Sequence, residues 1–298
     1  TAASGCYNPL MRVGNPYCRY GATGVTNYEA SSVAYFNLTL SAVQPNTGTG
    51  AGAAANAISP WEAYPGNTLA KDIGVGVDAS KNVALWAINS NGDVVGGTVG
   101  ATPQTLPSNV KAVRIAVDNK LQPWVVGANG YVAYWGPNNQ GVKGWISPVN
   151  QNPVPLASDV AVGANGTVWM VGTAANNYGI YRLTSNATWE AIASNARRIA
   201  VDPQGHAWVT WSDGTVSRYD PPSGQAAASW VDWSAEPKAR DVAVAGNGTV
   251  YAAGTDGRVY QRVSGKWQLI PGVLLNEIGA NGDTVFGIKP DQTIWYLR

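Results

Sequence analysis

Six charged residues recur at one position of a repeated pattern, each directly before a short apolar segment. They are Asp72, Arg114, Asp159, Arg198, Asp241 and Glu277, and the sign of the charge alternates over the first five. Such groups can form ion pairs that hold neighbouring elements in register, each contributing about 0–1 kcal/mol where exposed. They can also line polar clefts that hydrogen-bond sugar hydroxyls. The second interpretation makes Arg114, Asp159, Arg198 and Asp241 candidate ligand-binding residues.

Trp211 is a further candidate because it replaces the glycine found at the same place in neighbouring repeats, Gly172 and Gly254. An aromatic ring beside a turn can stack on the apolar face of a sugar, while a nearby carboxylate accepts its hydroxyls. We therefore predict Trp211 and Asp213 as a contact pair, with Asp256 on the same face. The alternative is that Trp211 packs under the insertion at residues 221–224.

His206 is the chain's one histidine and directly follows a turn glycine. It occupies the position of Thr167 and Thr249 in sister repeats, which favours an ordinary residue at the start of a strand. No carboxylate pair or Ser/His/Asp set can be assembled around one histidine, and metal-binding spacings are absent. The sequence therefore predicts no catalytic residue, metal or cofactor, and a protein that is not an enzyme.

The elements that position these residues repeat along the chain. The most regular unit is Asp241–Ile270, with Asn247-Gly248 and Asp256-Gly257 as tight turns between short alternating strands. First strands begin at Ile73, Ile115, Val160, Ile199, Val242 and Ile278, and an aromatic residue stands in register in each second strand. Four strands in a repeat of this size predict an all-β, six-bladed propeller of four-stranded blades.

Two incomplete ends suggest how the ring closes. The segment at Trp61 resembles the last strand of a blade but has no blade before it, and the chain stops after Trp295 and Tyr296 without a fourth strand. We expect the Trp61 segment to complete the last blade, which removes the exposed sheet edges. The predicted domains are an extension at 1–59 and a propeller at 60–298. The first blade has a weak outer strand without a tryptophan.

Composition excludes some classes of function. Charged residues make up 12% of the chain and the formal net charge is +1, which argues against nucleic-acid binding. No apolar run is long enough for a membrane-spanning helix.

Cys6 and Cys18, the only cysteines, predict a disulfide in the extension and an oxidising compartment. The first residue is Thr, so either a signal peptide has been removed or the sequence is truncated, and we expect a secreted protein. If a eukaryote secretes it, Asn37 and Asn186 are the better glycosylation acceptors.

The repeated combination of Trp-x-x-Ile, Val-Ala-Val, Asn-Gly and Val-Tyr resembles the tectonin repeat from about Trp61 to Arg298, most closely at residues 189–219 and 241–278. This resemblance implies a six-bladed propeller lectin that binds glycans or glycoconjugates and acts in innate defence. The chain departs from the pattern in its long extension and its first blade. The sugar and the oligomeric state stay open.

A second resemblance competes with the first. Residues 198–209 look like repeats of the streptogramin lyase type of propeller, a family that is usually seven-bladed and uses a histidine as a base. The alternative function is therefore a propeller lyase centred on His206. A third alternative is a protein-interaction scaffold, because propellers present loops to many partners.

Overall fold

The computed structural model describes residues 19–21, 24–26, 59–66, 69–223, 226–232 and 236–298. The chain divides into two compact units, Thr1–Ile58 and Ser59–Arg298. In the first, β1 (Arg19–Gly21) pairs antiparallel with β2 (Gly24–Thr26). Cys6, Cys18 and Asn37 lie outside the described residues, so the disulfide and this glycosylation site stay predictions.

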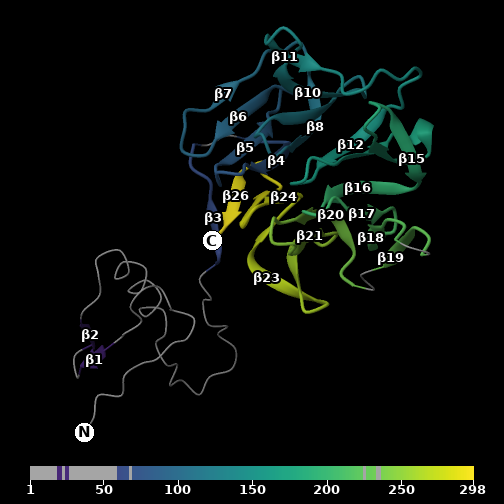
Figure 1. Ribbon diagram of the computed structural model, residues 1–298. Coiled ribbons are helices and arrows are strands. Elements are labelled where there is room, and N and C mark those ends of the chain that lie inside the picture. The colour runs from purple at the N-terminus through teal and green to yellow at the C-terminus, as the bar shows by residue number, and fades with distance from the viewer. Residues whose placement is uncertain (1–18, 22–23, 27–58, 67–68, 224–225, 233–235) are drawn as a thin grey trace. The chain divides into compact units, whose positions relative to one another are not determined.

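The second unit is built from six four-stranded antiparallel sheets arranged radially around an axis (Figure 1). Blade one contains β4 (Asp72–Val77), β5 (Val83–Ile88), β6 (Val94–Thr98) and β7 (Gln104–Thr105). Blade two contains β8 (Ala112–Val117), β9 (Pro123–Gly127), β10 (Val132–Pro137) and β11 (Lys143–Ile146). Blade three contains β12 (Ala157–Val162), β13 (Val168–Gly172), β14 (Ile180–Leu183) and β15 (Trp189–Ala193), with the short 3₁₀ helix η2 (Ala174–Asn176) between β13 and β14.

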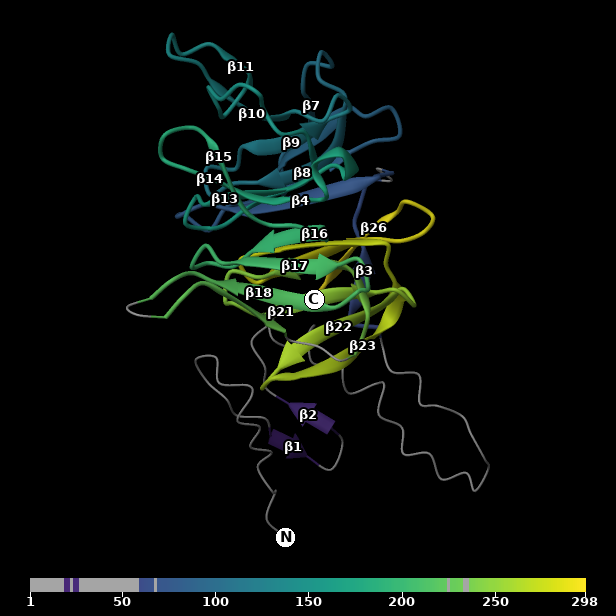
Figure 2. The same ribbon diagram turned by 90° about the vertical axis from the view of Figure 1, so that its right-hand side faces the viewer.

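The remaining blades follow the same order from the inside outwards. Blade four contains β16 (Ala196–Val201), β17 (Ala207–Trp211), β18 (Val216–Asp220) and β19 (Ser229–Asp232), of which the first three can be followed in Figure 2. Blade five contains β20 (Ala239–Val244), β21 (Val250–Gly254), β22 (Arg258–Val263) and β23 (Lys266–Leu274). Blade six contains β24 (Glu277–Asn281), β25 (Thr284–Ile288) and β26 (Ile294–Leu297). The predicted six-bladed, all-β propeller is confirmed.

The ring closes as the sequence predicts. The strand β3 (Trp61–Ala63) pairs antiparallel with β26, with Trp61 opposite Leu297 and Ala63 opposite Trp295. The amide of Tyr64 adds a hydrogen bond to the Ile294 carbonyl at 2.8 Å, and Glu62 pairs with Arg298. The last blade is therefore completed by a strand that precedes the first.

The core lies between adjacent blades and follows from the size of the residues on each sheet face. The second-strand aromatics are buried at the interfaces: Trp86, Trp124, Trp169, Trp208, Tyr251 and Phe286. The face of each sheet that meets these aromatic residues carries small residues of the inner strand. A Cβ added to Gly74 would lie 2.9 Å from the Ala116 carbonyl carbon of the next blade. Small residues on one face thus admit the neighbouring sheet at close range.

The two ends of the ring differ in the segments that reach them. One end, which we call the mouth face, carries the turns between second and third strands and the links from each outer strand to the next inner strand. The opposite face carries the turns between first and second strands and between third and fourth strands. In the described part of the chain, no helix has the length and hydrophobicity to cross a membrane.

Candidate functional site

The six charged residues singled out from the sequence stand at the start of the six inner strands, at the mouth face, and we call them the charge ring: Asp72, Arg114, Asp159, Arg198, Asp241 and Glu277. In blades two to five, the strand register shifts immediately before the charged residue, as between Ala112 and Arg114. A bulge of this kind bends the strand and changes the direction of the next side chain. The bulges therefore contribute to aiming the ring side chains.

The three aspartates of the odd-numbered blades each bind the backbone of the following blade. Asp72 Oδ2 accepts a hydrogen bond from the Ile115 amide at 2.7 Å, and Asp241 Oδ2 accepts one from the Ile278 amide at 2.7 Å. Asp159 Oδ2 does the same for the Ile199 amide at 3.0 Å. These amides belong to the inner edges of the sheets, where no neighbouring strand can accept them. Each carboxylate thus satisfies an otherwise orphaned donor and couples two blades.

The charged residues of the even-numbered blades meet across the axis. Arg114 Nη1 donates to Glu277 Oε1 at 3.4 Å, and Arg198 Nη2 donates to the same oxygen at 3.2 Å. Since the three residues come from blades two, four and six, their contacts span the opening of the central channel. The ring side chains stay partly accessible to solvent, with 19% exposure for Arg114 and 16% for Glu277.

Two further contacts complete the ring. Arg114 Nη1 lies 3.7 Å from Asp72 Oδ1, and Arg198 Nε lies 3.9 Å from Asp241 Oδ1. Both distances fit an ion pair but are too long for a hydrogen bond. Arg198 Nε is buried and has no hydrogen-bond acceptor among the described residues. The charge ring therefore contains one buried guanidinium N–H without a hydrogen-bond acceptor among the described residues.

Burial and mutual charge shift the ionisation of the ring. Burial raises the pKa of Asp72 to about 7, against the opposing effect of Arg114, and Glu277 and Asp159 raise it further. Burial also raises the pKa of Asp159 and of Asp241, the latter with a contribution from Glu277. Burial acts to lower the pKa of Arg114, but the Asp72 and Glu277 carboxylates outweigh it and raise the pKa. The ring thus combines a carboxyl group that titrates near neutrality with permanent cations.

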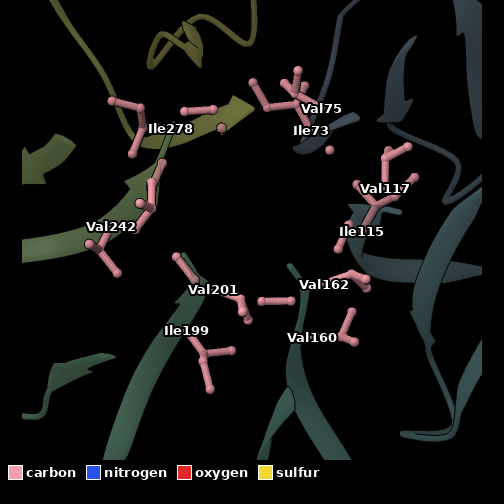
Figure 3. Close-up of a pocket in the computed structure, with 18 residues that line it drawn as sticks. Ile73, Val75, Ile115, Val117, Val160, Val162, Ile199, Val201, Val242 and Ile278 are labelled. Carbon is pink, nitrogen blue, oxygen red and sulfur yellow. The ribbon is translucent and has the colours of Figure 1, made fainter. Parts of the chain in front are cut away.

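Below the ring, the inner strands surround a narrow apolar channel (Figure 3). Its cavity of about 80 Å³ is lined by residues such as Ile73, Val117, Val160 and Ile278. This is far smaller than the several hundred Å³ typical of small-molecule pockets. A small molecule of ordinary size would therefore contact the charge ring and would not enter the channel.

Among the described residues, no three His, Cys, Asp or Glu side chains are grouped so as to hold a metal ion. The ring carboxylates show why: an oxygen of each aspartate is already used by a backbone amide, and Glu277 accepts from two arginines. The site geometry is one of ion pairs and hydrogen bonds.

The other predicted ligand contacts lie on the mouth face but outside the ring. The Trp211 indole donates from Nε1 to Ser217 Oγ at 2.6 Å and packs edge-on against Trp230, with ring centroids 5.1 Å apart. Asp213 accepts from the Thr215 amide at 2.9 Å, and Asp256 from the Arg258 amide at 2.9 Å. These contacts stabilise the turns, and the binding role of the three residues stays a prediction. Asn186 is exposed in the turn between β14 and β15.

His206 lies on the opposite face, in the turn between β16 and β17. Its Nδ1 is 3.0 Å from Asp202 Oδ2, and the side chain is 29% exposed. Asp202 Oδ1 also accepts the amides of Gln204 and His206, as Asp118 does for Lys120 and Gln122 in blade two. The aspartate therefore has a structural role in the turn, with or without a histidine.

Sequence reasoning found the members of the charge ring and part of their pairing. The predicted ion pairs between adjacent blades are present at Arg114–Asp72 and Arg198–Asp241. Glu277 also pairs with Arg114 and Arg198 across the channel, which was not predicted. Sequence reasoning also missed the bonds from the aspartates to the next inner strand. The sequence did contain a signal for those bonds, because an aspartate precedes the first strand of each odd-numbered blade.

Comparisons with known proteins identify the fold. No family model and no curated protein matches the chain. A putative gluconolactonase structure is similar with a TM-score of 0.59 at 13% identity, covering 80% of this chain and 92% of that one. A gluconolactonase from Xanthomonas campestris gives 0.56 at 13% identity, covering 75% and 84%. Virginiamycin B lyase from Staphylococcus aureus gives 0.51 at 10% identity, covering 79% and 98%. At these identities the likeness concerns the propeller fold alone.

These findings correct two expectations. They give no support to membership of the tectonin family or to a lectin function. They also contradict our prediction that the protein is not an enzyme, because structures of this fold are named as a gluconolactonase and a lyase. That prediction relied on finding one histidine and no Ser/His/Asp set, but a carboxylate and guanidinium site requires no histidine.

Proposed function

We propose that the chain is a β-propeller enzyme that performs acid–base chemistry on a small carbonyl compound at the mouth of its channel. The observation that carries the proposal is the pairing of Asp72, whose pKa is raised by burial to about 7, with Arg114 at 3.7 Å. A base is most effective when its pKa lies near the working pH. Perturbed groups of this kind cluster at functional sites.

In this proposal, Asp72 removes a proton from water or from a carbon next to the carbonyl group. Negative charge then develops on the carbonyl oxygen, and a fixed guanidinium N–H stabilises it. Arg198 is suited to this role because its guanidinium stands at the mouth, with 22% of the side chain exposed. Glu277 positions both arginines through its shared oxygen. The names of the similar structures make lactones and lyase substrates the first compounds to test.

His206 supports a second candidate function, a lyase with its base on the opposite face. Its contact with Asp202 would hold a proton on Nδ1 and leave Nε2 as the accepting nitrogen. A catalytically inactive variant of virginiamycin B lyase, bound to quinupristin, carries alanine in place of a histidine. The two candidates place the reaction on different faces of the same propeller.

An activity screen with sugar lactones and streptogramins separates these candidates. We expect Asp72→Asn to lower kcat/KM by about 100-fold or more, in the range found for loss of a general base, and His206→Ala to leave it unchanged. The wild-type kcat/KM should rise with pH through about 7, as Asp72 loses its proton. Loss of activity in His206→Ala but not in Asp72→Asn would favour the second candidate. No turnover of either substrate class would contradict the proposal for those substrates.

A further inference from the structure

A second cavity lies between blades one and two, on the face opposite the charge ring. It has a volume of about 220 Å³ and is lined by Trp86, Gln104, Lys120, Gln122, Trp135 and Lys143, together with two leucines and several small residues. We call it the basic cleft. It is separate from the channel mouth and independent of the proposed reaction there.

The cleft is open because blade one lacks a side chain that other blades have. Gly96 stands opposite Trp86 in the strand pair β5–β6. The corresponding residues of blades two, three and four lie against their second-strand tryptophans: Tyr134 stacks on Trp124, Arg182 lies over Trp169 and Arg218 lies over Trp208. The outer strand β7 has only two residues and carries no tryptophan. Because β6 has no side chain at Gly96 and β7 has no tryptophan, the Trp86 indole borders a cavity.

The charge of the cleft is positive. Lys120 and Lys143 are both exposed, and neither forms an ion pair with any described residue. No acidic residue lines the cavity. Asp118 belongs to the same turn, but it is buried and its oxygens accept the Lys120 and Gln122 amides and the Trp124 indole N–H. The ammonium groups are therefore the charges that a ligand would meet.

The sister cleft between blades four and five shows that this charge is specific to its position. That cavity also has a volume of about 220 Å³ and is lined by Arg218, Arg262 and Asp202, whose oxygens accept the Gln204 and His206 amides and the Trp208 indole N–H. Its Arg218 is held by Asp220 through two hydrogen bonds of 2.6 and 2.9 Å. In a cleft of equal size, a lining arginine is thus paired with a carboxylate of the protein. The cleft between blades one and two supplies only the cations.

We infer that the basic cleft binds a small acidic sugar, a six-membered ring carrying a carboxylate. The carboxylate would lie between Lys120 and Lys143, where it forms charge-assisted hydrogen bonds. The indoles of Trp86 and Trp135 offer apolar walls for the ring, and the amides of Gln104 and Gln122 can bond its hydroxyls. The cavity is smaller than a drug-sized pocket, which restricts the ligand to about one sugar unit.

Binding of sodium glucuronate, glucose and sodium acetate, measured by calorimetry and by shifts of the indole N–H resonances, tests this inference. We expect glucuronate to bind at least about tenfold more tightly than either fragment, a difference of about 1.4 kcal/mol. Raising the salt concentration should weaken it.

The double variant Lys120→Gln/Lys143→Gln should bind glucuronate at least about tenfold more weakly. The matched control is Lys81→Gln/Lys266→Gln, which removes two exposed lysines from other turns of the same face. Equal affinity for glucose and glucuronate would overturn the inference, as would equal weakening by both double variants or no saturable binding. Because this readout is binding on the opposite face, its failure leaves the proposed enzyme activity to be judged by its own assay.

Discussion

At the scale of single residues, the charge ring shows how one carboxyl group can serve both structure and chemistry. Asp72 holds the Ile115 amide with one oxygen and faces Arg114 with the other. The sequence allowed the ring residues to be predicted, because their chemical type and position repeat. The pairing of Glu277 with Arg114 and Arg198 could not be predicted, since it depends on the diameter and closure of the propeller.

The raised pKa of Asp72 has a consequence for folding that can be measured. A carboxyl group with a higher pKa in the folded state binds protons more tightly there, so its contribution to stability is lost as pH rises from about 4 to about 7. The loss has an upper bound of roughly 4 kcal/mol at 1.36 kcal/mol per pKa unit. We expect Asp72→Asn to reduce the decline in unfolding free energy over this range, because asparagine does not titrate. Its amide oxygen keeps an acceptor for the Ile115 amide.

Urea denaturation between pH 2 and pH 8 measures this difference. Asp213 is a useful comparison, because its hydrogen bonds with Thr215 lower its pKa and its contribution to stability is lost as pH falls. Asp213→Asn should therefore change the acidic side of the profile. An unchanged slope in Asp72→Asn would show that the group does not carry the proton in the folded protein.

At the scale of elements, blade one differs from its neighbours in ways that the sequence revealed only in part. The weak outer strand without a tryptophan was predicted, and β7 is the short strand that results. The cleft beside it was not predicted, because it also requires Lys120 and Lys143 to approach from blade two. A repeat pattern indicates which residues are equivalent, but it does not show what fills the space between repeats.

The strand β6 provides a matched pair of glycines for testing this packing. A Cβ added to Gly96 would lie 2.2 Å from the Leu85 carbonyl oxygen, whereas one added to Gly97 meets nothing within 4 Å. Both residues have positive φ, of 150° and 144°. We expect Gly97→Ala to cost roughly 1–2 kcal/mol of backbone strain, and Gly96→Ala to cost about 1 kcal/mol or more beyond that. Chemical denaturation of both variants gives the comparison, and equal losses would argue against the close approach at Gly96.

At the scale of the whole molecule, the propeller depends on the pairing of β3 with β26 across the two ends of the ring. This closure could be predicted because the sequence contained an outer strand without a blade and a blade without an outer strand. The radial arrangement then follows from small residues on one sheet face and aromatic residues on the other. The contacts of the charge ring across the channel could not be predicted from the sequence repeat, because they join non-adjacent blades.

Two tryptophans in equivalent positions can separate the effect of closure from the effect of packing. Trp61 pairs with Leu297 in blade six, and Trp189 pairs with Leu183 in blade three. Both are buried, with exposures of 3% and 6%. Replacing either by alanine should cost about 3–5 kcal/mol through lost packing. The strand β15 remains joined to its own blade by the chain, whereas β3 reaches blade six from the other end of the propeller, so Trp61→Ala should also weaken closure.

We therefore expect Trp61→Ala to lower the unfolding free energy more than Trp189→Ala and to broaden the thermal transition. Hydrogen exchange should show the reason. In Trp61→Ala, the amides of β26 should exchange faster together with those of its neighbour β25, because the outer face of blade six is uncovered when β3 detaches. In Trp189→Ala, faster exchange should stay within blade three. If the two variants lose equal stability and each shows only local exchange, the pairing of β3 with β26 contributes packing like any other outer strand and does not hold the ring closed.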